Sequence, residues 1–166
     1  MGQENFYEDI EMPPIIYEVG VKEANKFIET MLNFFMNKGV LYINSWDLVK
    51  HKDRLEKFKS DARVTQKGFL FPSFLKEGYN LNKEFVDIFN TEFLKNIDAK
   101  KAILSFEIYQ KGYPLVQCYD YFEDVFVNVA MPQHIIDGML QNKIVSSWEE
   151  VPPDSKYPRQ DIHPQI

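Results

Sequence analysis

The chain has 166 residues, 45% of them hydrophobic, and a formal net charge of -6 at pH 7. This length can bury the core of one domain without disulfides or metals. Because an acidic chain repels phosphate backbones, the charge argues against general nucleic-acid binding and favours a basic protein partner. Cys118 is the only cysteine, so no internal disulfide can form and a cytoplasmic location is expected. The chain has no apolar run near the ~20 residues that span a bilayer, and no membrane association is expected.

The two ends of the chain differ in composition from its middle. Residues 1–14 are polar and acidic and end in two prolines, which predicts a flexible arm. Residues 152–166 contain four prolines, which predicts an extended tail. Residues 15–151 are expected to form a single domain.

The first half of that domain shows short strands and one strong helical pattern. A short strand is expected at 15–17, and apolar residues at helical spacing predict a helix over 21–35. Gly39 is expected to provide its left-handed C-terminal cap. Residues 40–43 predict a second strand, and Ser45 is expected to cap a helix that runs to about residue 59.

The second half of the domain changes from helical to alternating periodicity. Residues 69–75 are apolar without a clear period, and Asn82 is expected to cap a helix through about residue 96. Alternation over 102–109 and 114–121, around a Lys111-Gly112 turn, predicts a hairpin, with a third strand near 125–129. Pro132 opens a last helix. The sequence therefore predicts an α+β fold in which N-terminal helices pack on an antiparallel β-meander of about residues 101–130, with a short C-terminal helix.

One short internal similarity links the two halves. Ser147-Trp148-Glu149 follows a predicted helix end and a predicted short strand, as Ser45-Trp46-Asp47 does. Both segments are expected to form a capped turn, and nothing else in the chain repeats.

The chain carries no recognisable catalytic, cofactor or metal motif. Its three histidines are not spaced as zinc ligands, and no glycine-rich phosphate loop is present. Cys118 falls in a predicted strand, where a lone cysteine is usually a buried apolar residue. The alternative is a small hydrolase that uses Cys118 with His134 and an aspartate, or a carboxylate pair such as Glu107 and Asp120 facing each other across the hairpin.

Charge is distributed unevenly along the chain. Residues 112–154 hold seven acidic residues and one lysine, whereas residues 48–67 hold seven basic and three acidic residues. These segments either neutralise one another across the fold, or the later one presents an acidic surface that attracts a cationic partner.

The preferred hypothesis is a non-enzymatic protein that binds a basic protein partner through an acidic surface bearing aromatic residues. In being short, acidic, aromatic-rich and without motifs, the chain resembles small bacterial immunity proteins, which implies an inhibitor of a cationic toxin such as a nuclease. The alternative to both this and the hydrolase is a structural or scaffold subunit that oligomerises through the apolar 69–75 segment, together with the helix face that bears Phe34 and Met36. The residues expected at the partner interface are Glu107, Tyr109, Tyr119, Asp120, Tyr121, Glu123 and Asp124.

Overall fold

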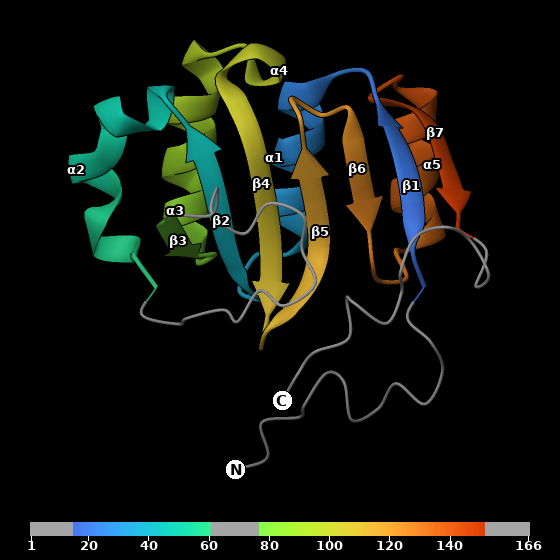
Figure 1. The fold of residues 1–166 in the computed structure, drawn as a ribbon, viewed down its shortest axis with the longest axis horizontal. Helices are drawn as coiled ribbons and strands as arrows, with labels where there is room; N and C mark the ends of the chain where they lie inside the picture. Colours follow the sequence, from blue (N-terminus) through green and yellow to red (C-terminus); the bar gives the residue numbers. More distant parts are fainter. Residues whose placement is uncertain (1–14, 61–76, 152–166) are drawn as a thin grey trace.

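The computed structural model describes residues 15–60 and 77–151 (Figure 1). The predicted acidic arm, the apolar 69–75 segment and the proline-rich tail lie outside the described residues. The strands are β1 (Tyr17–Val21), β2 (Val40–Ser45), β3 (Glu77–Asn80), β4 (Ile103–Gln110), β5 (Tyr113–Tyr119), β6 (Asp124–Val127) and β7 (Val145–Glu150). The α-helices are α1 (Ala24–Phe34), α2 (Lys52–Leu55), α3 (Lys83–Ile88), α4 (Ala99–Ala102) and α5 (Gln133–Gln141).

The strands form one sheet in which every neighbouring pair is antiparallel. Their order is β3-β2-β4-β5-β6-β1-β7. The strands β4, β5 and β6 follow one another in sequence and in space at the centre of the sheet, which confirms the predicted meander. The α+β class and the C-terminal helix are confirmed as well. The meander is extended on one side by β2 and β3 and on the other by β1 and β7.

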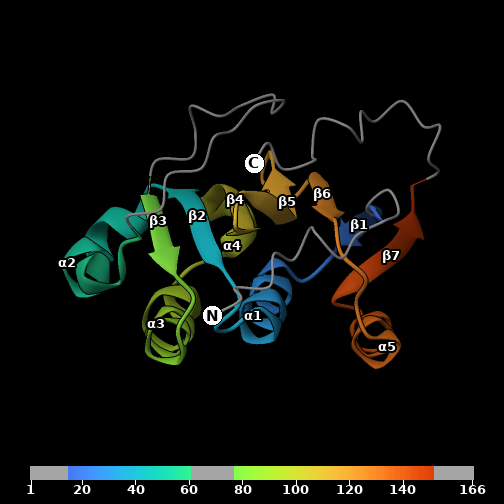
Figure 2. The ribbon, with the colours of Figure 1, turned by 90° about the horizontal axis from the view of Figure 1, so that it is seen from below.

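The sheet has one face covered by helices. Figure 2 shows α1, α3 and α5 along the same side of the strands. Alternation explains this layering, because Phe106 and Ile108 of β4 turn toward the helices and belong to the same buried core as Phe27 and Met31 of α1. In the described part of the chain, neither a helix nor a strand lies over the opposite face, which we call the open face.

Aromatic side chains fill much of the core between the sheet and α3. The rings of Tyr79 and Phe85 stack with centroids 5.3 Å apart, and the Phe89 ring lies 5.6 Å from Phe85 and 4.7 Å from Phe93. Such pairs contribute about 0.5–1.5 kcal/mol each beyond their buried area. Part of the high aromatic content of the chain therefore serves packing.

The helix that begins with an Asn82 cap is confirmed, but it is not uniform. Asn82 Oδ1 accepts a hydrogen bond from the Phe85 amide at 2.8 Å, as an N-cap requires. The α-helical turns of α3 continue into a wider π-helical segment, Phe89–Phe93, and a final 3₁₀ turn, Leu94–Asn96.

The helix predicted after Ser45 is wrong in its start and its continuity. Ser45 ends β2 and its hydroxyl donates to the Ala102 carbonyl at 2.7 Å, so tertiary contact with α4 replaces capping. The following residues form a 3₁₀ turn (Asp47–His51), the single turn α2 and another 3₁₀ turn (Glu56–Phe58). This segment has few apolar positions, so little of it packs against the core to stabilise a continuous helix.

Two further expectations are corrected by the backbone. The left-handed residue after α1 is Asn37, with φ 63°, and not Gly39; asparagine tolerates this conformation better than most residues. Trp148 and Glu149 lie inside β7, paired with Val19 and Glu18 of β1, and do not form a turn. The β1 strand supplies a pairing partner that the local sequence does not reveal.

Gly39 is required by a close backbone approach. A Cβ at this position would collide with the Tyr109 carbonyl oxygen of β4. We expect Gly39→Ala to lower the free energy of unfolding by about 2 kcal/mol, because the backbone must shift to relieve the overlap. A Cβ at Gly138 of α5 would face open space. Gly138→Ala is therefore the matched control and should raise stability by about 0.5–1 kcal/mol through helix propensity. Urea denaturation of both variants checks the pair; a neutral Gly39→Ala would contradict this account.

Candidate functional site

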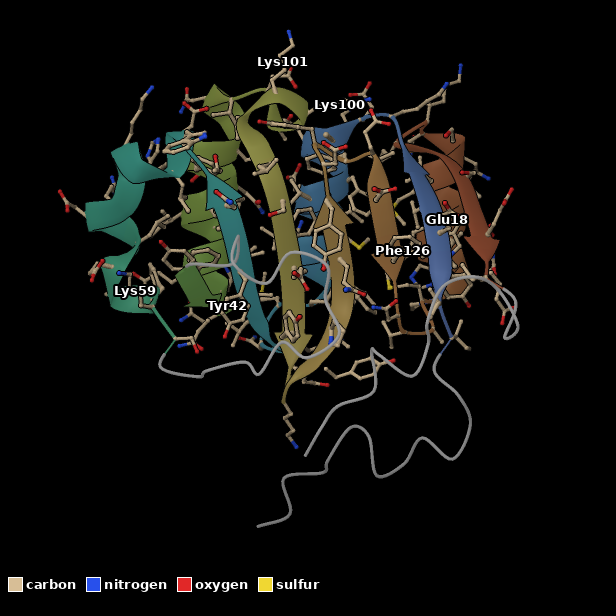
Figure 3. The ribbon with its side chains drawn as sticks, viewed as in Figure 1. Glu18, Tyr42, Lys59, Lys100, Lys101 and Phe126 are labelled. Atoms are coloured by element: carbon tan, nitrogen blue, oxygen red, sulfur yellow. The ribbon has the colours of Figure 1, made fainter. Side chains whose placement is uncertain are left out.

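The open face presents a row of side chains that crosses six strands. Residues directly opposite in antiparallel strands point to the same side of the sheet. The cross-strand pairing continues from Tyr42 to Glu107, Gln117, Phe126, Glu18 and Glu149, one residue from each of β2, β4, β5, β6, β1 and β7. Figure 3 labels Tyr42, Phe126 and Glu18, which lie across the width of the sheet. The row therefore combines three carboxyl groups and one amide with the aromatic rings of Tyr42 and Phe126.

Glu107 lies between Tyr42 and Gln117 in this row and is almost completely buried, with 1% of its surface exposed. Its Oε2 atom accepts a hydrogen bond from the Tyr109 hydroxyl at 2.8 Å. Its Oε1 atom is buried and has no hydrogen-bond partner. A carboxyl oxygen left without a partner in a buried position is costly. Of the six buried side-chain atoms without a partner among the described residues, Glu107 Oε1 is the one that belongs to a carboxyl group.

Burial changes the acid–base chemistry of the group. Desolvation raises the pKa of Glu107 from its ordinary value to about 7, against the smaller lowering effect of the Tyr109 and Tyr119 hydroxyls. Burial, followed by the nearby Glu107 charge, raises the pKa of both Tyr109 and Tyr119. Both tyrosines therefore remain hydroxyl donors, and Glu107 changes its charge near neutral pH.

Two aromatic rings, those of Tyr42 and Tyr109, pack against each other beside Glu107. The Tyr42 and Tyr109 rings meet edge to face, with centroids 5.6 Å apart and planes at 86°. Tyr42 lies across Gly78 of β3, where a Cβ would approach its Cε1 atom to 2.7 Å. The absence of a side chain at Gly78 thus makes room for the Tyr42 ring.

A second set of hydrogen bonds continues the polar network along β5. Gln117 donates to the Tyr119 hydroxyl at 3.0 Å, and Asn128 donates to Gln117 Oε1 at 2.7 Å and to the Pro114 carbonyl at 2.9 Å. The Tyr113 hydroxyl donates to the Asn128 carbonyl at 3.0 Å. These bonds position the Gln117 side chain beside Glu107 and connect it to the partly exposed Tyr119.

The turn between β5 and β6 has an unusual backbone. Asp120, Tyr121 and Phe122 have φ angles of 48°, 54° and 70°. Left-handed conformation costs non-glycine residues roughly 1–2 kcal/mol each and normally occurs one residue at a time. Tertiary contacts hold the turn: the Tyr121 amide donates to the Leu104 carbonyl at 3.0 Å, and the buried Phe122 ring lies 5.8 Å from Phe106.

This turn displays its acidic groups to solvent. Asp120, Glu123 and Asp124 are exposed, and Tyr121 is 39% exposed. In the part of the chain that the structure describes, no ion pair involves these three carboxylates. The basic middle segment pairs with other acids, as in Arg54–Glu92 at 3.0 Å and Lys57–Glu84 at 2.6 Å.

The interface residues predicted from sequence thus fall into two groups. Glu107, Tyr109 and Tyr119 meet on the open face, where Glu107 and Tyr109 are buried. Asp120, Tyr121, Glu123 and Asp124 are exposed in and beside the turn. The groups adjoin, because Tyr119 is partly exposed and lies opposite Asp124 in the register. The other described acids of residues 112–154 lie elsewhere, with Asp137 on α5 and Glu149 and Glu150 on β7.

Trp46 is a candidate residue that sequence analysis did not select. It follows β2 and is 83% exposed, the most exposed of the large hydrophobic side chains described. The end of β2, α4 and the end of β5 lie along one end of the sheet (Figure 1), so Trp46 and Tyr121 are at the same end. Lys100 and Lys101 of α4 also lie at this end (Figure 3). Its exposure could have been inferred from the sequence, because Trp46 is an apolar residue between the polar Ser45 and Asp47 and lies outside the predicted strand at 40–43.

Cys118 lies on the helix-covered side of β5, opposite Phe106, and is fully buried. Burial raises the pKa of its thiol, which opposes thiolate formation. We expect Ellman's reagent to leave the native thiol unmodified and to react stoichiometrically in denaturant. Rapid labelling of the native chain would contradict this burial and would restore the thiol-hydrolase interpretation.

The remaining chemistry is limited in the described residues. Within 15–60 and 77–151, no group of three or more His, Cys, Asp or Glu side chains is placed to hold a metal ion. The helices of the same residues fall short of the length and hydrophobicity that a bilayer crossing requires. Comparison of the chain with protein-family models, with curated proteins and with solved structures gives no match.

Proposed function

We propose that this chain is a non-enzymatic binding protein that engages a basic protein, most concretely an immunity or inhibitor protein that neutralises a bacterial toxin such as a nuclease. The observation that carries the proposal is the β5–β6 turn. It holds Asp120, Glu123 and Asp124 exposed, with no ion pair to any residue of 15–60 or 77–151, on a backbone fixed by Phe122.

The chemistry of such a turn suits a cationic surface. Carboxylates that need not break internal ion pairs keep their full charge for a partner, and complementary charge speeds association. Tyr121 and Trp46 add exposed aromatic area, the residue types that most often anchor interfaces. A nuclease that binds phosphate presents cationic groups in its active site, and carboxylates can occupy the positions of phosphate charges.

Backbone strain supports the same proposal. Three successive left-handed residues cost stability, and such strain concentrates at functional sites. The turn is positioned by the Tyr121–Leu104 hydrogen bond and by the Phe122 ring. The partner would therefore meet a rigid arrangement of acids that requires little ordering on binding.

Charge reversal tests the proposal. The natural partner is first isolated on the tagged chain from its native host, and its association with the purified chain is followed by stopped-flow and calorimetry. We expect Asp120→Lys, Glu123→Lys and Asp124→Lys together to slow association at least tenfold and to flatten its dependence on salt.

A matched variant separates local from global charge. Glu29, Asp53 and Asp137 are exposed on α1, α2 and α5, and their reversal to lysine changes the net charge equally. This variant should associate within about threefold of the wild-type rate. Equal rates for the wild type and the turn variant would refute the proposal, as would equal losses in both variants.

The two other candidate functions gain less from the geometry. A carboxylate hydrolase needs a second carboxylate beside Glu107. The pKa of Glu107 lies near neutral pH, which suits proton transfer, but its cross-strand neighbour is Gln117 and not Asp120. For a scaffold, the 69–75 segment lies outside the described residues, and Phe34 and Met36 are partly buried against the core.

A further inference from the structure

We propose that Glu107 and the tyrosines around it form a binding site for one guanidinium group, supplied by an arginine of the basic partner. The inference rests on the proposed function, because it names the partner group and adds a second contact beyond the acidic turn. Its basis is the unpartnered Oε1 atom of Glu107, held in a side chain that is 1% exposed.

The orphaned oxygen indicates what is missing from the site. Tyr109 donates to Oε2, and the Gln117 amide donates to the Tyr119 hydroxyl and not to Glu107. The Tyr119 hydroxyl lies near enough to lower the pKa of Glu107, but Oε1 has no hydrogen-bond partner. No basic side chain of the described residues forms an ion pair with Glu107. A buried carboxyl oxygen without a donor gains most from a charged donor that arrives from outside.

The surroundings favour a guanidinium over a more strongly hydrated cation. Tyr42 and Tyr109 meet edge to face beside the carboxyl group, and aromatic faces attract cations. A guanidinium is planar, weakly hydrated and able to stack on such rings while it donates to a carboxylate. An ammonium loses more hydration on entering the same site.

The site also adjoins the surface that is proposed to bind first. Tyr119 is partly exposed, lies opposite Asp124 and interacts with Glu107. A side chain of a partner that is bound at the acidic turn can therefore reach Glu107 past Tyr119, if the Tyr119 ring moves aside. Glu107, Tyr119 and Asp124 lie on the same face of the sheet.

Protonation competes with the cation. The titratable groups that face Glu107 are Tyr42, Tyr109 and Tyr119, with the Cys118 thiol on the other side of β5. Each of them remains protonated near neutral pH, so Glu107 controls the charge of the site. Since burial raises the pKa of Glu107 to about 7, a bound cation has to displace a proton below that pH.

The first test uses ethylguanidinium chloride and the full-length chain without a partner. Amide resonances of Glu107, Gln117 and Tyr119 should shift saturably, more strongly at pH 8 than at pH 5.5, and less with ethylammonium chloride at equal ionic strength. The shifts should disappear in Glu107→Gln. Absence of saturable shifts in the wild type, or identical shifts in Glu107→Gln, would overturn the inference.

The second test uses the complex. Glu107→Gln should weaken partner affinity at least tenfold, mainly through faster dissociation, while the association rate and its salt dependence stay at wild-type values. Unchanged affinity of Glu107→Gln would overturn the guanidinium site. The proposed function is judged separately, because it is upheld if the lysine substitutions at the acidic turn abolish association. Tyr119→Phe retains the ring and should weaken affinity less than Glu107→Gln; a loss as large would contradict the primary role given to the carboxylate.

Discussion

Glu107→Gln is expected to make the isolated chain more stable than the wild type by about 3 kcal/mol at pH 9, with little difference at pH 4.5. The folded-state pKa of Glu107 is raised to about 7 from an ordinary value of 4.5. The folded wild type therefore holds a proton that the unfolded chain releases between these values, and its stability falls as the pH rises through this window. The amide stays neutral and can still accept from Tyr109, so the variant avoids this loss.

The size of the effect follows from the shift, since each pKa unit corresponds to about 1.4 kcal/mol. Urea denaturation of both proteins from pH 4.5 to pH 9 measures the difference directly, because contributions of other groups cancel. Glu123→Gln, at an exposed carboxyl, serves as the control and should follow the wild type at every pH. A constant difference between Glu107→Gln and the wild type would show that Glu107 is not buried as described.

Trp46→Ala should weaken partner binding by about 2 kcal/mol or more, which is roughly thirtyfold in Kd, without changing stability. Large aromatic side chains at the centre of interfaces typically contribute this much. Because 83% of the Trp46 surface is exposed, its removal leaves no cavity in the core. Calorimetric titration of the partner and urea denaturation measure the two quantities.

Leu140→Ala provides the comparison for Trp46. Leu140 is 39% exposed on α5, on the helix-covered side of the sheet (Figure 2). Its loss should leave partner affinity within about twofold of the wild type. Equal affinities for Trp46→Ala and Leu140→Ala would remove Trp46 from the interface.

Local pattern predicted the parts of this fold whose stability is local. Alternation over residues 102–109 and 114–121 predicts the β4–β5 hairpin, and the Asn82 cap predicts the start of α3, because both signals act over a few residues. Only the start of the β7 strand was predicted, since Trp148 and Glu149 continue the strand only by pairing with Val19 and Glu18. Such pairing joins segments over 120 residues apart, and no local signal specifies it.

The candidate site was predictable in its residue types but not in its geometry. Alternation places Glu107, Tyr109 and Tyr119 on one side of their strands. The burial of Glu107 and its contact with the Tyr42–Tyr109 pair depend on the register between β2 and β4, which the sequence does not reveal. The separation of the late acids into the turn, α5 and β7 likewise depends on topology. In the sequence these acids lie within one segment, residues 112–154, and were therefore expected to form one surface.

The central claim is that a basic protein binds the chain at the acidic turn between β5 and β6. Mapping the complex by amide resonance perturbation, with the isolated partner added to the labelled chain, tests it most directly. The account predicts that the largest perturbations fall on residues 119–124 and on the indole of Trp46, with α1, α3 and α5 little affected. Perturbations concentrated on those helices, with the turn unchanged, would contradict it.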